Sequence, residues 1–224
     1  MKKSLYLILV SLFVAGLGQT LACTNLIVGK KASKDGSVMI SYSCDDYGAF
    51  GFMNWQPGGT HKKGEMRPLY HYESNNYLGE IPEAKQTYSV IGLMNEFQLT
   101  IHETTFGGRE ELEDTTGLFD YGSLMYVTLQ RARNAREAIK VMGELVEKYG
   151  YCTNGESFSI ADPNEVWILE MIGKGPGRKG AVWVAVRIPD DCISAHANQS
   201  RIRQFPLKDK ENCIYSKDVI SFAR

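Results

Sequence analysis

The stretch that decides the fold is CTNLIVGKKASKDGSVMISYSC, residues 23–44. Its apolar part, Thr24 to Val28, is typical of a short β-strand. The segment 33–36, Ser-Lys-Asp-Gly, has the composition of a hairpin turn, and residues 37–44 are expected to return as a second strand. Because the strands of a hairpin run antiparallel, this pairing would put Cys23 across from the far end of the second strand, near Asp45. The sequence therefore predicts that a thiol and a carboxylate converge.

The residues before Cys23 predict a secretory signal peptide at residues 1–22. A basic start, Met1-Lys2-Lys3, precedes an apolar run from Leu5 to Leu17, and small residues occupy the first and third positions before Cys23. The run is shorter than the roughly 20 residues that a spanning helix needs. We therefore expect an exported mature domain at residues 23–224, periplasmic or secreted, without stable membrane insertion after processing.

A bacterial lipoprotein signal also places a cysteine first after the cut, which leaves a second interpretation of Cys23. Lipidation would convert the thiol to a thioether and acylate the amine, so a lipidated Cys23 could not act as a nucleophile. The usual lipoprotein site has Leu three residues before the cysteine, whereas this chain has Thr20 there. The alternative from a different class is thus a lipid-anchored binding protein without enzymatic activity.

Composition restricts the function classes. Removing residues 1–22 leaves 202 residues, enough for one domain, with 23 basic and 26 acidic side chains and a net charge of −3. This balance does not favour nucleic acid or an anionic membrane as a partner. The spacing of histidines and cysteines gives no support to a metal site, and no cofactor is expected. The oligomeric state is left open.

The five cysteines are an odd number, so at least one thiol stays unpaired in an oxidising compartment. We assign that role to Cys23, while the other four could form two bridges or none. They are Cys44, Cys152, Cys192 and Cys213.

The rest of the chain predicts strands, then helices, then strands. Residues 48–87 show no sustained periodicity and are expected to be a long irregular segment. The other expected elements are a strand pair at 88–94 and 97–103, helices at 124–131 and from 134 or 135 to about 149, a strand pair at 157–161 and 166–171, and another at 182–187 and 192–197. This order is typical of an α+β fold with helices packed on antiparallel sheets.

An N-terminal cysteine joins a nucleophile and a base in one residue, because its free α-amine has a proton affinity close to that of its thiol. Asp45 is the candidate carboxylate to orient that amine. Asn95 and Asn154 could donate hydrogen bonds to a tetrahedral oxyanion, although an Asn before Glu or Gly is also a common turn residue. Arg201 is either a surface cation or a clamp for a carboxylate.

Six motifs, in order along the chain, resemble the cysteine-type N-terminal-nucleophile dipeptidases, the group of dipeptidase A. They are the start from Cys23 to Ser37, Gly92 to Phe97, Glu103 to Gly108, Asp120 to Leu124, Gly155 to Phe158, and Ala195 to Arg201. The resemblance covers the whole mature chain. It implies a four-layer αββα sandwich and the hydrolysis of short peptides, mainly dipeptides, without a metal.

The resemblance also implies roles for single residues. Cys23 would be the nucleophile and its amine the base, Asp45 would hold the amine, and Asn95 and Asn154 would line the oxyanion site. Arg201 would match the late active-site arginine of the related penicillin V acylases and bile-salt hydrolases. Those enzymes suggest the alternative of an amidase that acts on non-peptide acyl amides.

Two departures from the family pattern concern the site and the chain length. Many relatives have Arg-Asn-x-Asp before the carboxylate, whereas this chain has Tyr42-Ser43-Cys44-Asp45. Relatives are also commonly longer, so the sandwich is expected to be incomplete at the C-terminus.

Overall fold

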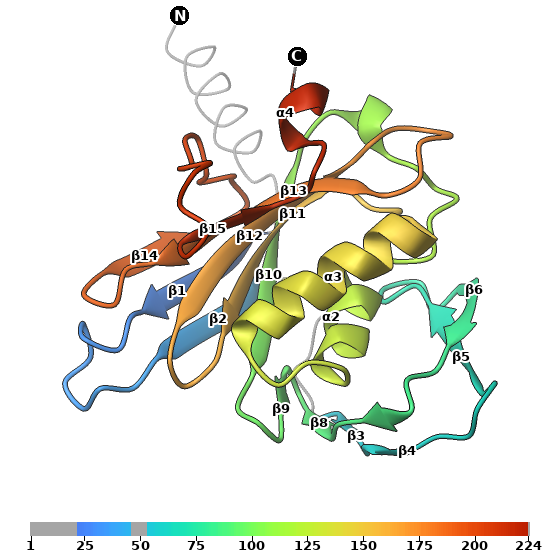
Figure 1. Ribbon diagram of the computed structural model, residues 1–224, viewed down its shortest axis with the longest axis horizontal. Coiled ribbons are helices and arrows are strands. Elements are labelled where there is room, and N and C mark those ends of the chain that lie inside the picture. Colours follow the sequence, from blue (N-terminus) through green and yellow to red (C-terminus); the bar gives the residue numbers. More distant parts are fainter. Residues whose placement is uncertain (1–21, 46–52, 224) are drawn as a thin grey trace, which may run out of the picture.

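The computed structural model describes residues 22–45 and 53–223 of the protein (Figure 1). The signal peptide predicted for residues 1–22 therefore lies outside the described residues, except for Ala22. Within the described part, helices cover one face of a large antiparallel sheet and a small sheet lies against its other face. No helix of residues 22–45 and 53–223 combines the length and the hydropathy required to span a membrane.

The hairpin predicted from the opening stretch is confirmed. Strand β1 (Ala22–Val28) pairs with β2 (Met39–Asp45), and the register sets Cys23 opposite Cys44 and Ala22 opposite Asp45. Gly36 in the connecting loop has a φ of 80°, a conformation that glycine adopts without steric cost. A third strand, β14 (Ile193–His196), pairs with the other edge of β1 and completes the small sheet.

The large sheet has eight strands in the order β15-β13-β12-β11-β10-β9-β8-β3. Its central strands β11 (Gly155–Ala161) and β12 (Val166–Gly173) are buried along almost their whole length, because both of their faces are covered. The other strands are β3 (Trp55–Gln56), β8 (Val90–Ile91), β9 (Met94–Asn95), β10 (Thr100–Gly107), β13 (Ala181–Ile188) and β15 (Cys213–Tyr215).

Two helices lie on the outer face of this sheet. Helix α2 (Tyr121–Leu129) begins at Asp120, whose carboxylate accepts hydrogen bonds from two main-chain N–H groups of the first turn. Helix α3 (Ala135–Tyr149) is capped by the side chain of Asn134 and ends at Gly150, which has a φ of 86°. Both predicted helices are confirmed, although α2 begins three residues earlier than expected.

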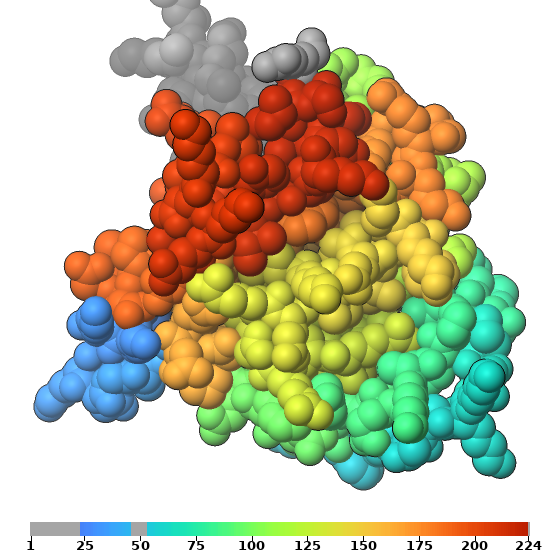
Figure 2. Space-filling model, in the orientation of Figure 1, coloured from blue at the N-terminus to red at the C-terminus, as the bar shows by residue number. Residues whose placement is uncertain are grey.

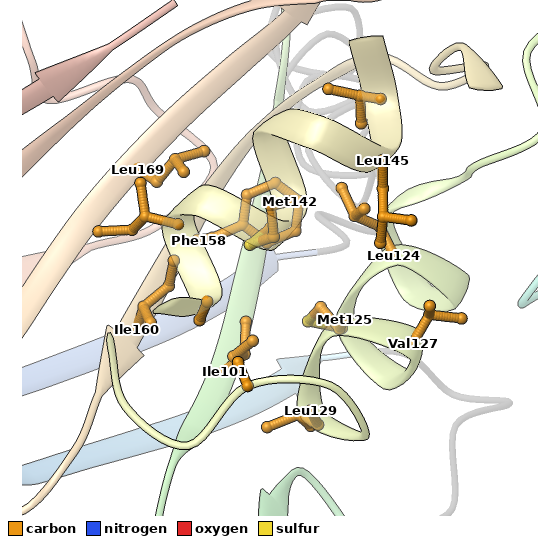
Figure 3. Packing of buried hydrophobic residues seen from close by; sticks show 14 of the residues in the cluster. Ile101, Leu124, Met125, Val127, Leu129, Met142, Leu145, Phe158, Ile160 and Leu169 are labelled. Atoms are coloured by element: carbon orange, nitrogen blue, oxygen red, sulfur yellow. The ribbon is translucent and has the colours of Figure 1, made fainter. Parts of the chain in front are cut away.

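The main core lies between these helices and the sheet. Figure 3 shows Met142 and Leu145 of α3, with apolar side chains of α2, facing Ile101, Phe158 and Leu169 of the strands. A smaller apolar cluster, with Ile27 of β1, joins the two sheets. The described residues thus form three layers, α–β–β. The α+β class is confirmed, and the four-layer αββα sandwich stays a prediction.

Three expectations about the strands are wrong. The segment 48–87, expected to be irregular, contains the hairpin of β5 (Met66–Tyr70) and β6 (Tyr77–Pro82) and the short pair β4 (Gly59–Thr60) and β7 (Gln86–Thr87). Each strand of the β5–β6 hairpin buries a single residue fully, Leu69 and Ile81, so the alternation of polar and apolar residues is weak.

The predicted strand at 88–94 is split by a turn at Gly92, so that β8 pairs with β9 and β9 with β10. The predicted pairing of strands 182–187 and 192–197 does not form either. Strand β13 pairs with β12 and β15, whereas β14 crosses to the small sheet. The short elements β15, η1 (Glu110–Leu112) and α4 (Val219–Phe222) were not predicted.

Candidate active site

Cys23 lies in the middle strand of the small sheet, with a neighbour on each side. On one side, Cys44 of β2 is its direct partner. On the other side, the N–H of Cys23 donates to Oδ1 of Asn198 at 2.5 Å, and Nδ2 of Asn198 donates to the carbonyl of Thr105 at 2.6 Å. Asn198 therefore connects the nitrogen of Cys23 to strand β10 of the large sheet.

Asn198 belongs to the motif Ala195 to Arg201 but was not among the predicted site residues. The register of β1 with β14 explains its place, because Asn25 pairs with His196 and two further residues along each chain bring Cys23 opposite Asn198. Asn198 has a φ of 36°, so the chain turns at this residue. Only the non-local pairing of β1 with β14 could have identified it.

Asp45 lies where the sequence placed it, at the end of β2. Its strand partner is Ala22, the residue whose carbonyl is bonded to the nitrogen of Cys23. A chain cut after Ala22 would therefore begin beside Asp45. The Asp45 carboxylate is exposed, and with the described part of the chain it makes no hydrogen bond.

The thiol of Cys23 is half-buried and faces acidic surroundings. Burial, then the charge of Glu103 and then the neighbouring Cys44 raise its pKa to about 12 in the uncut chain. Hydrogen bonding from Tyr42 acts in the opposite direction. With the nitrogen of Cys23 held in a peptide bond, the thiol has no amine base and stays protonated at neutral pH. All five cysteines are free thiols.

Tyr42 occupies the position at which many members of the family that this chain resembles have Arg. Its hydroxyl donates to Oε1 of Glu103 at 2.7 Å, and its ring packs against His102 with 5.3 Å between the ring centroids. Burial, followed by the charge of Glu103, raises the pKa of Tyr42. The side chain next to the thiol is therefore a neutral phenol rather than a guanidinium.

Below Cys23, buried polar side chains join the two sheets. The ring of His196 lies 2.7 Å from the hydroxyl of Thr104 and 2.8 Å from that of Ser159, and the amide of Asn25 lies 3.4 Å away. Burial lowers the pKa of His196 to about 4, so this ring is neutral. Burial lowers the pKa of His102 to about 4 as well. His196 is thus a structural link between β14, β10 and β11.

Asn95 is buried at the end of β9, next to the turn that leads to β10. Its Nδ2 donates to the carbonyls of Leu129 and Ala132 at 2.8 and 2.7 Å, and its Oδ1 accepts from the N–H groups of Phe97 and Leu99. Both amide hydrogens are therefore used to hold the turn against helix α2. In this arrangement Asn95 has none left for an oxyanion.

Asn154 and Arg201 are exposed, and the structure does not connect either of them to Cys23 through a contact of the described residues. Asn154 precedes β11, and its carbonyl accepts from the hydroxyl of Tyr151. The main-chain N–H of Arg201 donates to Oε1 of Glu170 on β12, which leaves its guanidinium at the surface.

A cavity of about 490 Å³ lies along the other half of β2 and is separate from Cys23. Its lining includes Ile40, Met94, Thr100 and His102. Cys23 does not line it, so we place the candidate site by the geometry around the thiol and not by the size of this cavity. Figure 2 shows that the β1–β2 loop and the loop before β14 project from one side of the molecule, away from α3.

Comparison with known proteins identifies the family of the chain. The family described as Peptidase family C69 matches residues 22–56 and 57–224. A probable dipeptidase of Salmonella dublin is 32% identical, over 93% of this chain and 50% of that protein. Dipeptidase A of Lactobacillus helveticus is 32% identical, over 88% of this chain and 44% of that protein. The chain spans about half the length of the curated relatives it matches.

Proposed function

The chain belongs to peptidase family C69, and from this membership we propose that it forms the catalytic part of an exported cysteine dipeptidase with Cys23 as its N-terminal nucleophile. The observation that carries the proposal is the position of the Cys23 nitrogen. It lies between the Asn198 amide and the end of β2, where Asp45 faces the last residue before the cut.

Cleavage after Ala22 would supply the missing base. The new α-amine, with an ordinary pKa of about 7.7 to 8.0, takes the thiol proton, and Asp45 and Asn198 orient it. The thiolate then attacks the scissile carbonyl of the peptide. The amine donates its proton to the leaving amino group, and an acyl-thioester remains on Cys23. Water, activated by the same amine, releases the acyl group and restores the thiol.

Other residues would bind the substrate and the tetrahedral intermediate. Of the two predicted oxyanion donors, Asn154 has amide hydrogens that are not donated within the described residues, whereas those of Asn95 are used by main-chain carbonyls. We therefore retain Asn154 for this role. The exposed guanidinium of Arg201 would bind the free carboxylate of the dipeptide, because a planar fork of N–H groups matches a carboxylate.

The first experiment compares the N-terminus of the purified full-length protein with its activity. Mass spectrometry identifies the mature first residue, and a panel of dipeptides measures hydrolysis before and after treatment with iodoacetamide. A free Cys23, with hydrolysis that is lost on alkylation and in Cys23→Ala, supports the proposal. Cys192→Ala is the matched control, because Cys192 is an exposed free thiol in a turn at the other end of the small sheet.

Two outcomes would contradict the proposal. Hydrolysis that persists after Cys23 is alkylated excludes this nucleophile, and a diacylglyceryl group on Cys23 supports the lipid-anchored binding protein. Penicillin V and a conjugated bile acid are measured in parallel. Faster hydrolysis of either than of every dipeptide would support the amidase alternative.

A further inference from the structure

Two glutamates lie side by side on β10 and β11 of the large sheet. In the β10–β11 register Thr105 is the direct partner of Glu156, and Glu103 is two residues before Thr105. Paired residues of an antiparallel sheet, and residues two apart in a strand, share a face. Glu103 and Glu156 therefore point to the same face as diagonal neighbours, the face on which Phe158, the direct partner of Glu103, packs in the main core. Their exposed fractions are only 3% and 1%.

Each of these carboxyl groups has one oxygen with a partner and one without. Oε1 of Glu103 accepts from the Tyr42 hydroxyl, and Oε1 of Glu156 accepts from the Thr105 hydroxyl, both at 2.7 Å. Within the described residues, the two buried Oε2 atoms receive no hydrogen bond, and no Lys or Arg forms an ion pair with either carboxyl group. A buried carboxylate without a cation or a donor is costly, so the two carboxyl groups share a proton unless a cation binds between them.

A third carboxylate makes the surroundings more acidic. Glu73, in the loop between β5 and β6, accepts from the Tyr121 hydroxyl at 2.9 Å, and its charge acts on both buried glutamates. Burial is the main cause that raises the pKa of Glu103 and of Glu156, and for Glu156 the charge of Glu103 comes next. Without a ligand, the pair is therefore expected to hold a proton.

Glu103 is connected to the nucleophile through Tyr42. The charge of Glu103 is felt by the Cys23 thiol, and Tyr42, which binds Glu103, lies on the face of the small sheet that carries Cys23 and Cys44. On the other side, Asn198 connects the Cys23 nitrogen to the carbonyl of Thr105, the residue opposite Glu156.

We propose that Glu103 and Glu156 bind the free α-ammonium group of the dipeptide, an assignment that rests on the proposed function. In a dipeptide only one carbon separates the ammonium nitrogen from the scissile carbonyl carbon, so a carboxylate that binds the ammonium must lie beside the nucleophile. The two unpaired Oε2 atoms match the N–H donors of an ammonium group. Binding displaces the proton that the pair holds, and the pair becomes ionised.

This assignment explains how the site would distinguish a dipeptide from an acyl amide. A substrate with a blocked amine leaves two buried carboxylates without a cation, and a site built for a charged donor rejects analogues that lack it. The KM for a free dipeptide should fall as pH rises through the pKa of the pair. The titratable side chains that face the pair are Glu73, Tyr42, Tyr121 and Cys23.

The test uses the processed full-length protein and two substrates, Ala-Ala and N-acetyl-Ala-Ala. The wild type should favour the free dipeptide by at least about 100-fold in kcat/KM. Glu156→Gln and Glu103→Gln should each raise the KM for Ala-Ala by about 10- to 100-fold, and so reduce the preference for the free dipeptide over the acetylated substrate, since each loses one charge-assisted hydrogen bond. Asp114→Asn is the control, a buried carboxylate that holds a turn through Thr116.

Calorimetry separates this assignment from the proposed function. Processed Cys23→Ala should bind Ala-Ala and release protons, so the measured heat should depend on the ionisation enthalpy of the buffer. Glu156→Gln in the same background should bind Ala-Ala at least about tenfold more weakly. Binding without hydrolysis in the parent would contradict the peptidase and support the ammonium site. Equal binding with and without Glu156→Gln, or an unchanged preference between the two substrates in both glutamate variants, would overturn the assignment.

Discussion

The two sheets differ in how their side chains are used. In the large sheet, β11 and β12 are buried almost throughout and pack against α2, α3 and the small sheet. In the small sheet, every side chain of β2 is exposed or half-buried, and β14 buries only His196. The large sheet therefore supplies most of the stability, whereas the small sheet holds the candidate nucleophile on comparatively few apolar contacts.

A second comparison concerns whether buried polar side chains have hydrogen-bond partners. On the helix side of the large sheet, Asn95 and Asp120 use their side chains to hold turns and helix ends. On β1 and on β10–β11, four buried polar atoms have no partner within the described residues. They belong to Asn25, His102, Glu103 and Glu156. Unpaired buried atoms also occur on the helix side, in Thr128 and Arg131, whereas that of Glu103 belongs to a carboxyl group bonded to Tyr42, where a substrate could satisfy it.

The largest effect on stability should come from the core of the large sheet. Phe158→Ala should lower the free energy of unfolding by about 3–5 kcal/mol, because it leaves a cavity in the main core. Leu26→Ala in the small sheet, where the side chain is 53% exposed, should change it by less than about 0.5 kcal/mol. Urea unfolding of the full-length protein measures both. A comparable cost for Leu26→Ala would remove the distinction between the sheets.

A pair of asparagines tests the same distinction for activity. Asn95→Ala should lower the free energy of unfolding by about 1–3 kcal/mol, since it leaves buried main-chain groups without partners, and should leave the kcat of the folded enzyme unchanged. Asn198→Ala should have the opposite result, with a kcat lowered about 10- to 100-fold and little change in unfolding. A fall in kcat of about 100-fold or more in Asn95→Ala would instead restore Asn95 as an oxyanion donor.

The neutral His196 should make stability depend on pH. Its pKa of about 4 in the folded chain lies below the ordinary 6.5, so between pH 6.5 and pH 4 only the unfolded state takes up this proton. The free energy of unfolding should fall as pH is lowered through that range, by at most about 1.4 kcal/mol per pH unit. The contribution of His196 should be fully present above about pH 6.5.

Because the raised pKa values of Glu103 and Glu156 act in the opposite direction, the measurement is the difference between the wild type and His196→Asn. His71→Asn, in the loop after β5, is the control. If the two variants have the same pH dependence as the wild type, His196 is not the group that titrates.

The smallest effect on stability is expected for Arg201. Arg201→Ala removes an exposed guanidinium and keeps the main-chain N–H that binds Glu170, so unfolding should change by less than about 0.5 kcal/mol. The KM for a dipeptide should rise about tenfold if this guanidinium binds the substrate carboxylate. An unchanged KM would remove Arg201 from the site.

Apolar spacing and turn residues predicted the helix and the hairpin that are formed by residues close together in the sequence. Helix α3 follows from its apolar spacing between Asn134 and Gly150, and the β1–β2 hairpin follows from its turn and its two apolar segments. The position of Asp45 beside the start of the mature chain came from the same hairpin. These features depend on residues close together in the sequence, where propensity and periodicity are informative.

The features that sequence reasoning missed depend on distant pairing. Strand β14 was expected to pair with its neighbour β13, and Asn198 became visible only once β14 was found beside β1. Glu103 was quoted in a motif, but its relation to Glu156 needs the β10–β11 register. No local pattern encodes which strand lies next to which, because tertiary packing decides it.

The position of β1 also determines when the site can form during synthesis. Cys23 and Asn198 are 175 residues apart, so β1 can pair with β2 as soon as the hairpin emerges, but its other edge stays open until β14 has been translated. Contacts between such distant residues form late, because a long loop must close first. The nitrogen of Cys23 therefore acquires its amide partner only when nearly the whole of this sequence has left the ribosome, which makes the geometry around the thiol one of the last parts of the fold to be completed.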